Sequence, residues 1–168
     1  MQERIKQLAA LVGRPLQKKR WQMAVAESCT GGLLGAALTS IPGSSSYFYG
    51  GVVSYSNQAK QDLLGVSLET LTAWGAVSEA TAREMAEGIR KRCRVDLGIA
   101  ITGIAGPDGG SPHKPVGTVY LALATEQVLR IEKKHFGGNR TEIREASVEA
   151  ALQMLKAFLE DSGDLDIS

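Results

Sequence analysis

The feature that most constrains the fold of this chain is the clustering of its glycines. The 168 residues include 19 glycines, above the ~7% of ordinary proteins. They cluster at Gly31–Gly32, Gly50–Gly51, Gly103 with Gly106, Gly109–Gly110 and Gly137–Gly138. Such clusters mark sharp turns and places where a ligand approaches the backbone. Several follow predicted strands, as in enzymes that build sites at strand ends, so we expect an α/β protein.

Hydrophobic periodicity predicts helices and strands that alternate along the chain. Helices are predicted over 3–19, from Gly32 to about 39, over 57–64, from Ser78 to about 92, and from 139 onward. Strands are predicted over 22–26, 47–55, 95–102, 119–124 and 128–136, the last two as a hairpin. Asn57 is the expected N-cap of the short helix, and Asn139 with Glu142 resembles a capping box. We expect one domain over 1–168, with an acidic tail from about 161.

Composition excludes several classes of protein. Apolar residues make up 43% and charged residues 22% of the chain, as in globular domains. The net charge is +1 and aromatic residues make up 5%, so no nucleic-acid partner is expected. Apolar runs fall short of the ~20 residues of a membrane span, and segment 1–6 is unlike a signal peptide, so we expect no membrane partner and a cytoplasmic location. Two cysteines cannot form a disulfide framework, and no metal-ligand spacing occurs.

Ser28 is the first candidate for chemistry. It lies where a predicted strand ends and a helix begins, just before Thr30, Gly31 and Gly32. Backbone N–H groups at a helix start are free and lie at the positive end of the helix dipole, so they could hold an oxyanion. The alternative is that Ser28 or Thr30 only caps the helix. Cys29 is a rival nucleophile, although buried cysteine is commonly just a small apolar residue.

A serine nucleophile needs a base, and two kinds of residue offer one. His113 and His135 lack a recognisable Asp partner motif, so a Ser-His-Asp triad is not favoured. Lys60 follows Tyr55 by five residues, and a lysine can act as a base if burial or a nearby cation lowers its pKa. The alternative for Lys60 is an ordinary solvated surface lysine.

Two glycine-rich segments could bind a ligand. Segment 102–110 follows a predicted buried strand, and its backbone amides could approach a phosphate or a carboxamide. As a pattern it is equally compatible with an irregular surface loop. Segment 137–140 combines a helix start with Arg140, which suits a phosphate. It is also compatible with a hairpin exit followed by a capped helix.

Three motifs carry a resemblance to a known family. They are AESCTGG at 26–32, GVVSYSNQAK at 51–60, and TGIAGPDGG at 102–110 with KPVGTV at 114–119. Together with GAVS at 75–78, they resemble the CinA C-terminal domain family, the nicotinamide-nucleotide amidases. The similarity runs from about residue 4 to 160 in order and spacing. The N-terminal domain of longer CinA proteins is missing, so the chain looks like the stand-alone form.

The resemblance implies a three-layer α/β/α fold with a mixed, mostly parallel central sheet. It implies hydrolysis of nicotinamide mononucleotide to nicotinate mononucleotide and ammonia, in pyridine nucleotide salvage, with no cofactor and no metal. The family's Ser-Lys pair falls on Ser28 and Lys60, and Tyr55 is expected to hydrogen-bond to one of them. Arg140 is expected to bind the 5′-phosphate. Further substrate-binding positions are expected at Thr30, Gly31, Asn57, Thr102, Gly103, Ala105 and Gly106.

Two other functions stay open on the sequence. A catalytically silent relative would use the glycine loops and Arg140 to bind a nucleotide as a sensor or partner module. An amidase or esterase for a different small molecule would keep the dependence on Ser28. Because two-fold assembly is common, the expected oligomer is a homodimer.

Overall fold

A mixed five-stranded sheet forms the middle layer of the computed structural model, which describes residues 2–162. The strand order is β2-β1-β3-β4-β5. β1 pairs in parallel with β2 and β3, whereas β3–β4 and β4–β5 are antiparallel, so only β4 runs against the others. The expected mixed, mostly parallel sheet is confirmed. The strands are β1 (Met23–Glu27), β2 (Phe48–Val53), β3 (Leu97–Gly103), β4 (Thr118–Ala124) and β5 (Leu129–His135).

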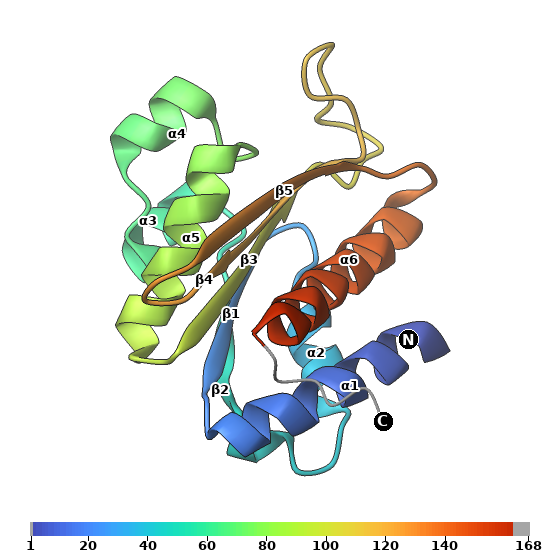
Figure 1. The fold of residues 1–168 in the computed structure, drawn as a ribbon. Helices are drawn as coiled ribbons and strands as arrows, with labels where there is room; N and C mark the ends of the chain where they lie inside the picture. Colours follow the sequence, from blue (N-terminus) through green and yellow to red (C-terminus); the bar gives the residue numbers. More distant parts are fainter. Residues whose placement is uncertain (1, 163–168) are drawn as a thin grey trace.

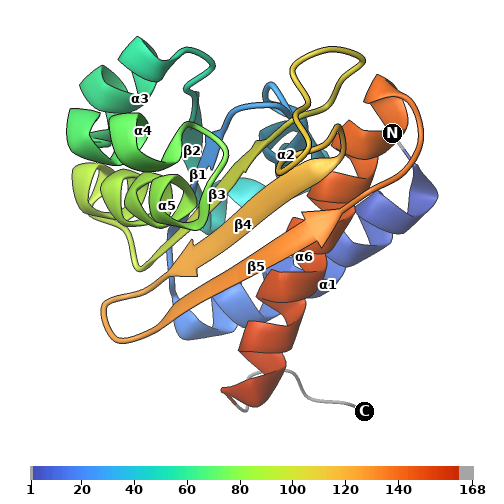
Figure 2. The same cartoon turned by 90° about the horizontal axis from the view of Figure 1, so that it is seen from above.

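Helices cover both faces of this sheet, which confirms the three-layer architecture (Figure 1). Seen from above, α1, α2 and α6 lie on one side of the sheet and α3, α4 and α5 on the other (Figure 2). No helix within 2–162 is both long and apolar enough to cross a bilayer. The helices are α1 (Glu3–Lys19), α2 (Leu33–Thr39), α3 (Asn57–Leu64), α4 (Leu68–Trp74), α5 (Glu79–Cys93) and α6 (Arg140–Asp161), with a 3₁₀ turn at Ser44–Ser46.

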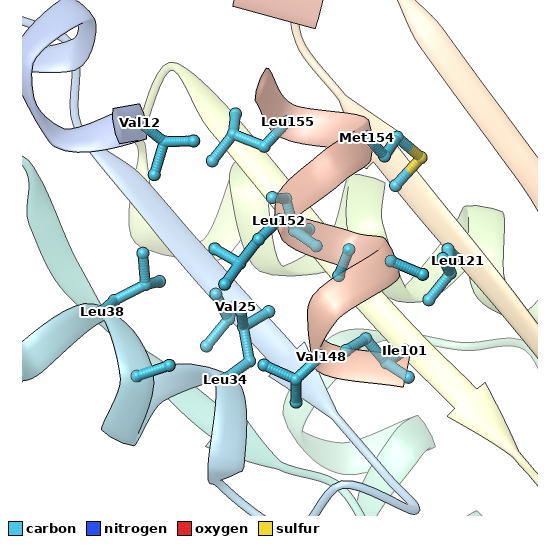
Figure 3. Packing of buried hydrophobic residues seen from close by; sticks show 14 of the residues in the cluster. Val12, Val25, Leu34, Leu38, Ile101, Leu121, Val148, Leu152, Met154 and Leu155 are labelled. Carbon is cyan, nitrogen blue, oxygen red and sulfur yellow. The ribbon is translucent and has the colours of Figure 1, made fainter. Parts of the chain in front are cut away.

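Side chains of the central strands alternate between two hydrophobic cores, as the two-residue period of a strand requires. In β3, Leu97, Ile99 and Ile101 belong to the core under α1, α2 and α6. Figure 3 shows this core, in which apolar side chains from all three helices meet those of the sheet. Removal of this surface from water, at about 25 cal/mol per Å², is the main force that holds the layers together.

The second core uses small residues, which lets α5 approach β3 closely. Ala100 of β3 and Ala24 of β1 face it. A Cβ on Gly98 would lie 2.3 Å from the carbonyl oxygen of Ala86 in α5. Glycine is therefore required at position 98 by the packing of α5 on the sheet.

Most predicted elements occur, with two corrections. The hairpin of β4 and β5 and the capping box of Asn139 and Glu142 are confirmed. Asn57 is not the N-cap of α3, because Ser56 takes that position and its hydroxyl accepts from the Ala59 N–H at 3.0 Å. Helix α4 was not predicted; its seven residues are too few to show a clear helical period. The acidic tail falls largely in 163–168, outside the described residues.

Candidate functional site

A cleft of about 260 Å³ lies at the edge of the sheet where β1 and β3 end. In open α/β sheets, ligands bind at this carboxyl edge. Residues far apart in the sequence meet here because the two parallel strands end side by side. The lining residues are Ser28, Cys29, Tyr55, Lys60, Ala76, Val77, Thr102, Gly103, Ile104, Ala105, Gly106, Asp108, Gly109 and Arg140.

Ser28 and Lys60 form a buried pair in this cleft. Lys60 Nζ donates a hydrogen bond to Ser28 Oγ at 3.0 Å. Ser28 is 7% exposed and Lys60 only 1%, so Lys60 is not the solvated surface lysine of the alternative interpretation. Ser28 directly follows β1, and its backbone N–H donates to Ile101 O at 3.0 Å. The nucleophile candidate is thereby fixed to the central strands.

Backbone carbonyls aim the amine of Lys60 at the serine. Lys60 Nζ also donates to the carbonyl oxygens of Ser54 at 2.8 Å and Tyr55 at 3.3 Å. Burial lowers the pKa of Lys60 below its usual value, because removal from water disfavours the ammonium form. A larger share of Lys60 is therefore neutral near physiological pH than of a solvated lysine, as a general base requires.

The buried carboxylate of Glu27 caps helix α2, a role that sequence analysis missed. Its Oε2 accepts from the Thr30 hydroxyl at 2.6 Å and from two backbone N–H groups of the helix start, and its Oε1 accepts from the Gly35 N–H at 2.8 Å. The alternative that Ser28 or Thr30 caps the helix is therefore wrong. The helix begins only after Gly31 and Gly32, with φ of 58° and 98°, which leaves the Ser28 hydroxyl to Lys60. An acidic residue shortly before a helix start was the available signal.

The turn after Ser28 offers one backbone donor at the cleft. Gly31 N–H donates to Ser28 O at 3.0 Å, so it is not available as the oxyanion donor that the sequence suggested. Within residues 2–162, no backbone carbonyl accepts from the N–H of Cys29. Cys29 lies in the wall of the cleft. The Cys29 amide is therefore the candidate for binding an oxyanion next to Ser28.

Arg144 of α6 holds the same turn from the other side and was not predicted. Its Nε donates to Cys29 O at 3.1 Å and its Nη2 to Thr30 O at 2.9 Å. The residues are 115 and 114 positions apart. No local sequence signal could reveal such a contact, because it depends on how α6 docks on the sheet.

Arg140 links two walls of the cleft. Its Nη1 donates to Gly106 O at 2.7 Å and its Nη2 to the Tyr55 hydroxyl at 2.9 Å. The expected hydrogen bond from the Tyr55 hydroxyl to Ser28 or Lys60 is therefore not present. The side chain of Tyr55 is 61% exposed and turns outward to Arg140, while its backbone carbonyl contacts Lys60.

The segment 102–110 lines the cleft largely with backbone. Thr102 is buried and its hydroxyl donates to Ala76 O at 2.8 Å, which joins the two loops. A Cβ on Gly103 would lie 2.7 Å from Val119 Cγ2, and one on Gly106, with φ of 78°, 2.5 Å from Val116 Cγ1. A side chain at either position would thus disturb the wall of the cleft.

Some candidate residues do not reach the cleft. Thr30, Gly31 and Asn57 are absent from its lining, and so are His113 and His135, which are both exposed. The Ser-His-Asp alternative has no support in this geometry. Within residues 2–162, no group of three or more His, Cys, Asp or Glu side chains could hold a metal ion.

The Cys29 thiol is poorly suited to act as the nucleophile. Burial raises its pKa to about 11, and the negative charge of Glu27 adds to this rise. The thiolate is the reactive form of cysteine, so Cys29 is protonated and inert at neutral pH. Ser28 with its adjacent amine is the better nucleophile of the two.

A larger hollow, about 670 Å³, lies beside α4 and α5. Its Arg83 and Glu87 pair with each other at 3.3 Å, and the Ser78 hydroxyl donates to Gly75 O. It holds no nucleophile with an adjacent base, so the smaller cleft is the candidate active site.

Comparisons with known proteins agree on one family. The family model of the CinA C-terminal domain matches residues 5–159. A CinA-like protein from Syntrophobacter fumaroxidans is 53% identical over 94% of this chain and 37% of its own length. A putative competence-damage inducible protein from Caldanaerobacter subterraneus is 49% identical over 92% of this chain and 37% of its own. The chain thus spans little more than a third of these relatives.

Two crystal structures are similar over nearly their whole length. A competence/damage inducible protein from Agrobacterium tumefaciens has a TM-score of 0.91 and 46% identity, covering 94% of this chain and 96% of that one. A competence-damaged protein superfamily member from Klebsiella pneumoniae has a TM-score of 0.90 and 36% identity, covering 94% and 98%.

Proposed function

This chain belongs to the CinA C-terminal domain family, and from that premise we propose that it hydrolyses the carboxamide of nicotinamide mononucleotide to nicotinate mononucleotide and ammonia. The observation that carries the proposal is the 3.0 Å hydrogen bond between Lys60 Nζ and Ser28 Oγ. In this cleft the buried serine can act as the nucleophile and the buried amine beside it as the base. The arginine can bind the phosphate of the substrate.

In the first half of the reaction, Ser28 Oγ attacks the carboxamide carbon. Neutral Lys60 takes the hydroxyl proton as the new C–O bond forms. The amide oxygen becomes an oxyanion, which the N–H of Cys29 stabilises. A single donor of this kind contributes about 3–4 kcal/mol in well-studied enzymes. Lys60 then gives its proton to the departing nitrogen, so that the C–N bond breaks and ammonia leaves.

In the second half, water releases the acid. Lys60, neutral again, takes a proton from a water molecule that attacks the acyl carbon. The C–O bond to Ser28 breaks, and the serine recovers its proton from Lys60. One amine thus serves as base and acid in both halves, as general acid–base catalysis allows.

The charges of the cleft suit a pyridine nucleotide. Arg140 retains N–H donors beyond the two that bind Gly106 and Tyr55, and these can bind a phosphate by charge-assisted hydrogen bonds. Asp108, which also lines the cleft, can offset the positive charge of the pyridinium ring.

The test of this function is ammonia release from nicotinamide mononucleotide, with nicotinate mononucleotide identified by chromatography. We expect stoichiometric release of both products by the wild type and by Ser46→Ala, a control serine that precedes β2 and lies at the amino ends of the strands. No release from folded wild-type protein would contradict the proposal. Calorimetric binding of the nucleotide without turnover would then support the silent nucleotide-binding alternative.

Arg140→Ala is expected to raise KM for the mononucleotide about 10- to 100-fold and to leave kcat within about threefold. The reason is that a charge-assisted hydrogen bond contributes about 1.5–3 kcal/mol, and this one forms equally in ground and transition states. Nicotinamide riboside, which lacks the phosphate, should show no such KM change. Arg130→Ala, whose guanidinium pairs with Asp161, is the matched control. A loss of kcat with KM unchanged would contradict the assignment of Arg140.

A further inference from the structure

Two walls of the cleft come from segments that are far apart in the sequence. The first wall is segment 74–77, which contributes Ala76 and Val77 to the lining. The second wall is segment 102–114, which lines the cleft between residues 102 and 109. Because both segments line one cleft, their separation sets its width and decides which ligands fit.

Two side-chain hydrogen bonds join these walls. The Thr102 hydroxyl donates to Ala76 O at 2.8 Å. Thr102 belongs to β3 and is buried, so this contact lies at the sheet. At the other end of the second wall, Lys114 Nζ donates to Trp74 O at 2.6 Å. Lys114 therefore ties the part of the second wall that is farther along the chain to the first wall.

The backbone of Lys114 is held in a way that lets its side chain reach the first wall. Lys114 N–H donates to Ser111 Oγ at 3.1 Å, and Ser111 N–H donates to Lys114 O at 2.8 Å. At the base of the same loop, Gly117 N–H donates to Ile104 O at 2.8 Å. The loop is thus closed at its base and at its tip, so the position of the tip influences how the stretch between them lies along the cleft.

The ammonium group of Lys114 suits the end of helix α4. This helix ends at Trp74, and the last carbonyl groups of a helix lie at the negative end of its dipole, which attracts a cation. The next residue, Gly75, has a φ of 79°, and a Cβ there would lie 3.4 Å from Lys114 Nζ. The ammonium group is therefore seated against the backbone of the first wall, in a charge-assisted hydrogen bond.

We propose that Lys114 is a positioning residue that holds the second wall against the first and so sets the width of the cleft for its ligand. The effect on turnover rests on the proposed function, whereas the effect on the walls does not depend on the substrate. Lys114 is absent from the lining of the cleft and faces the larger hollow beside α4 and α5. Its loss should therefore weaken binding and leave the chemical step at Ser28 unchanged.

The first test is hydrogen exchange of the protein without substrate, followed by mass spectrometry. In Lys114→Met, which removes the ammonium group, we expect peptides within 104–114 to exchange about threefold faster or more, because the loss of an exposed charged contact eases local opening. Peptides of β4 should exchange as in the wild type. Lys114→Arg, which keeps a cationic donor, should restore the wild-type exchange. His113→Ala, which changes an exposed neighbour on the same turn, is the matched control.

The second test separates an effect on the walls from a direct contact with the phosphate. We expect Lys114→Met to raise KM about three- to tenfold for both the mononucleotide and nicotinamide riboside, and to leave kcat within about twofold. Both molecules should be affected because the width of the cleft matters to each of them. Lys114→Arg should keep KM within about twofold of the wild-type value.

Four outcomes would overturn the proposal. They are unchanged exchange of 104–114 in Lys114→Met, faster exchange with an unchanged KM, faster exchange throughout the chain, and a KM that rises for the mononucleotide alone. The third would show a merely structural role, and the fourth a direct contact of Lys114 with the phosphate.

Failure of the proposed reaction is distinguishable from failure of this inference. If the wild type does not release ammonia from the nucleotide, calorimetric binding of the nucleotide replaces KM as the measurement. Weaker binding by Lys114→Met together with faster exchange of 104–114 then supports the inference and contradicts the proposed reaction. Equal results for the variant and the wild type contradict both.

Discussion

Ser28→Ala and Lys60→Met are each expected to lower kcat for the mononucleotide by about 10³-fold or more. Ser28→Ala removes the atom that attacks, and Lys60→Met removes the amine 3.0 Å from it. Residues that act as one unit are strongly non-additive, so the double variant should be about as slow as the slower single one. The measurement is single-turnover kinetics of ammonia release. Lys91→Met, which removes an exposed lysine of α5, is the matched control.

The same pair sets the expected pH profile. Only neutral Lys60 can take the serine proton, so kcat/KM should rise with pH and level off above the pKa of Lys60. Burial lowers that pKa, so the plateau should begin below the ~10.4 of a solvated lysine. If Lys60→Met retained a tenth of the wild-type activity, or if the activity fell as pH rose from 6 to 8, Lys60 would not be the base.

Glu27→Ala is expected to lower the free energy of unfolding by about 3–5 kcal/mol. The carboxylate is 1% exposed and accepts four hydrogen bonds. Without it, three backbone N–H groups and a hydroxyl lose their partner, and each unsatisfied buried group costs about 1–3 kcal/mol. The cost stays below the sum because water can enter the space left by the side chain.

The variant Glu27→Gln tests whether Glu27 stabilises the fold through its hydrogen bonds or only by filling space. An amide oxygen can replace Oε2, which accepts three of the bonds, but the amide NH₂ would then face Gly35 N–H, so one donor would meet another. We expect a loss of about 1–2 kcal/mol, measured by urea unfolding. Glu126→Ala, in the exposed hairpin turn, should change stability by less than about 0.5 kcal/mol. Equal losses for alanine and glutamine would show that the hydrogen bonds are not what Glu27 contributes.

Much of the fold was predictable because the pattern of apolar residues is local. The helical spacing of Ile5, Leu8 and Val12 predicts α1, and each of these residues is buried. The capping box of α6 could be predicted directly from the sequence, from Asn139 and Glu142. Ser28 and Gly103 line the same cleft because the two strands that they follow or end, β1 and β3, finish at one edge of the sheet. Residue type and chain position were sufficient for these features.

The other features of the site depend on contacts between distant residues, which no local sequence pattern predicts. The partner of the Tyr55 hydroxyl is Arg140, 85 positions away, and that of the Cys29 carbonyl is Arg144. Whether a hydroxyl, a carboxylate or a backbone group satisfies a donor is decided by distances that only the assembled layers set. For this reason, the residue that caps α2 is Glu27 and not Ser28 or Thr30.

The position of Arg140 and Arg144 on the last helix has a consequence for biosynthesis. A ribosome delivers Ser28 and Lys60 first, whereas Arg140 follows 80 positions after Lys60 and Arg144 follows four positions later. Until α6 docks, the nascent chain has the serine and the amine without the guanidinium groups that hold the turn and the cleft wall. Any activity that depends on these arginines is therefore acquired only after α6 has been synthesised and has docked on the sheet.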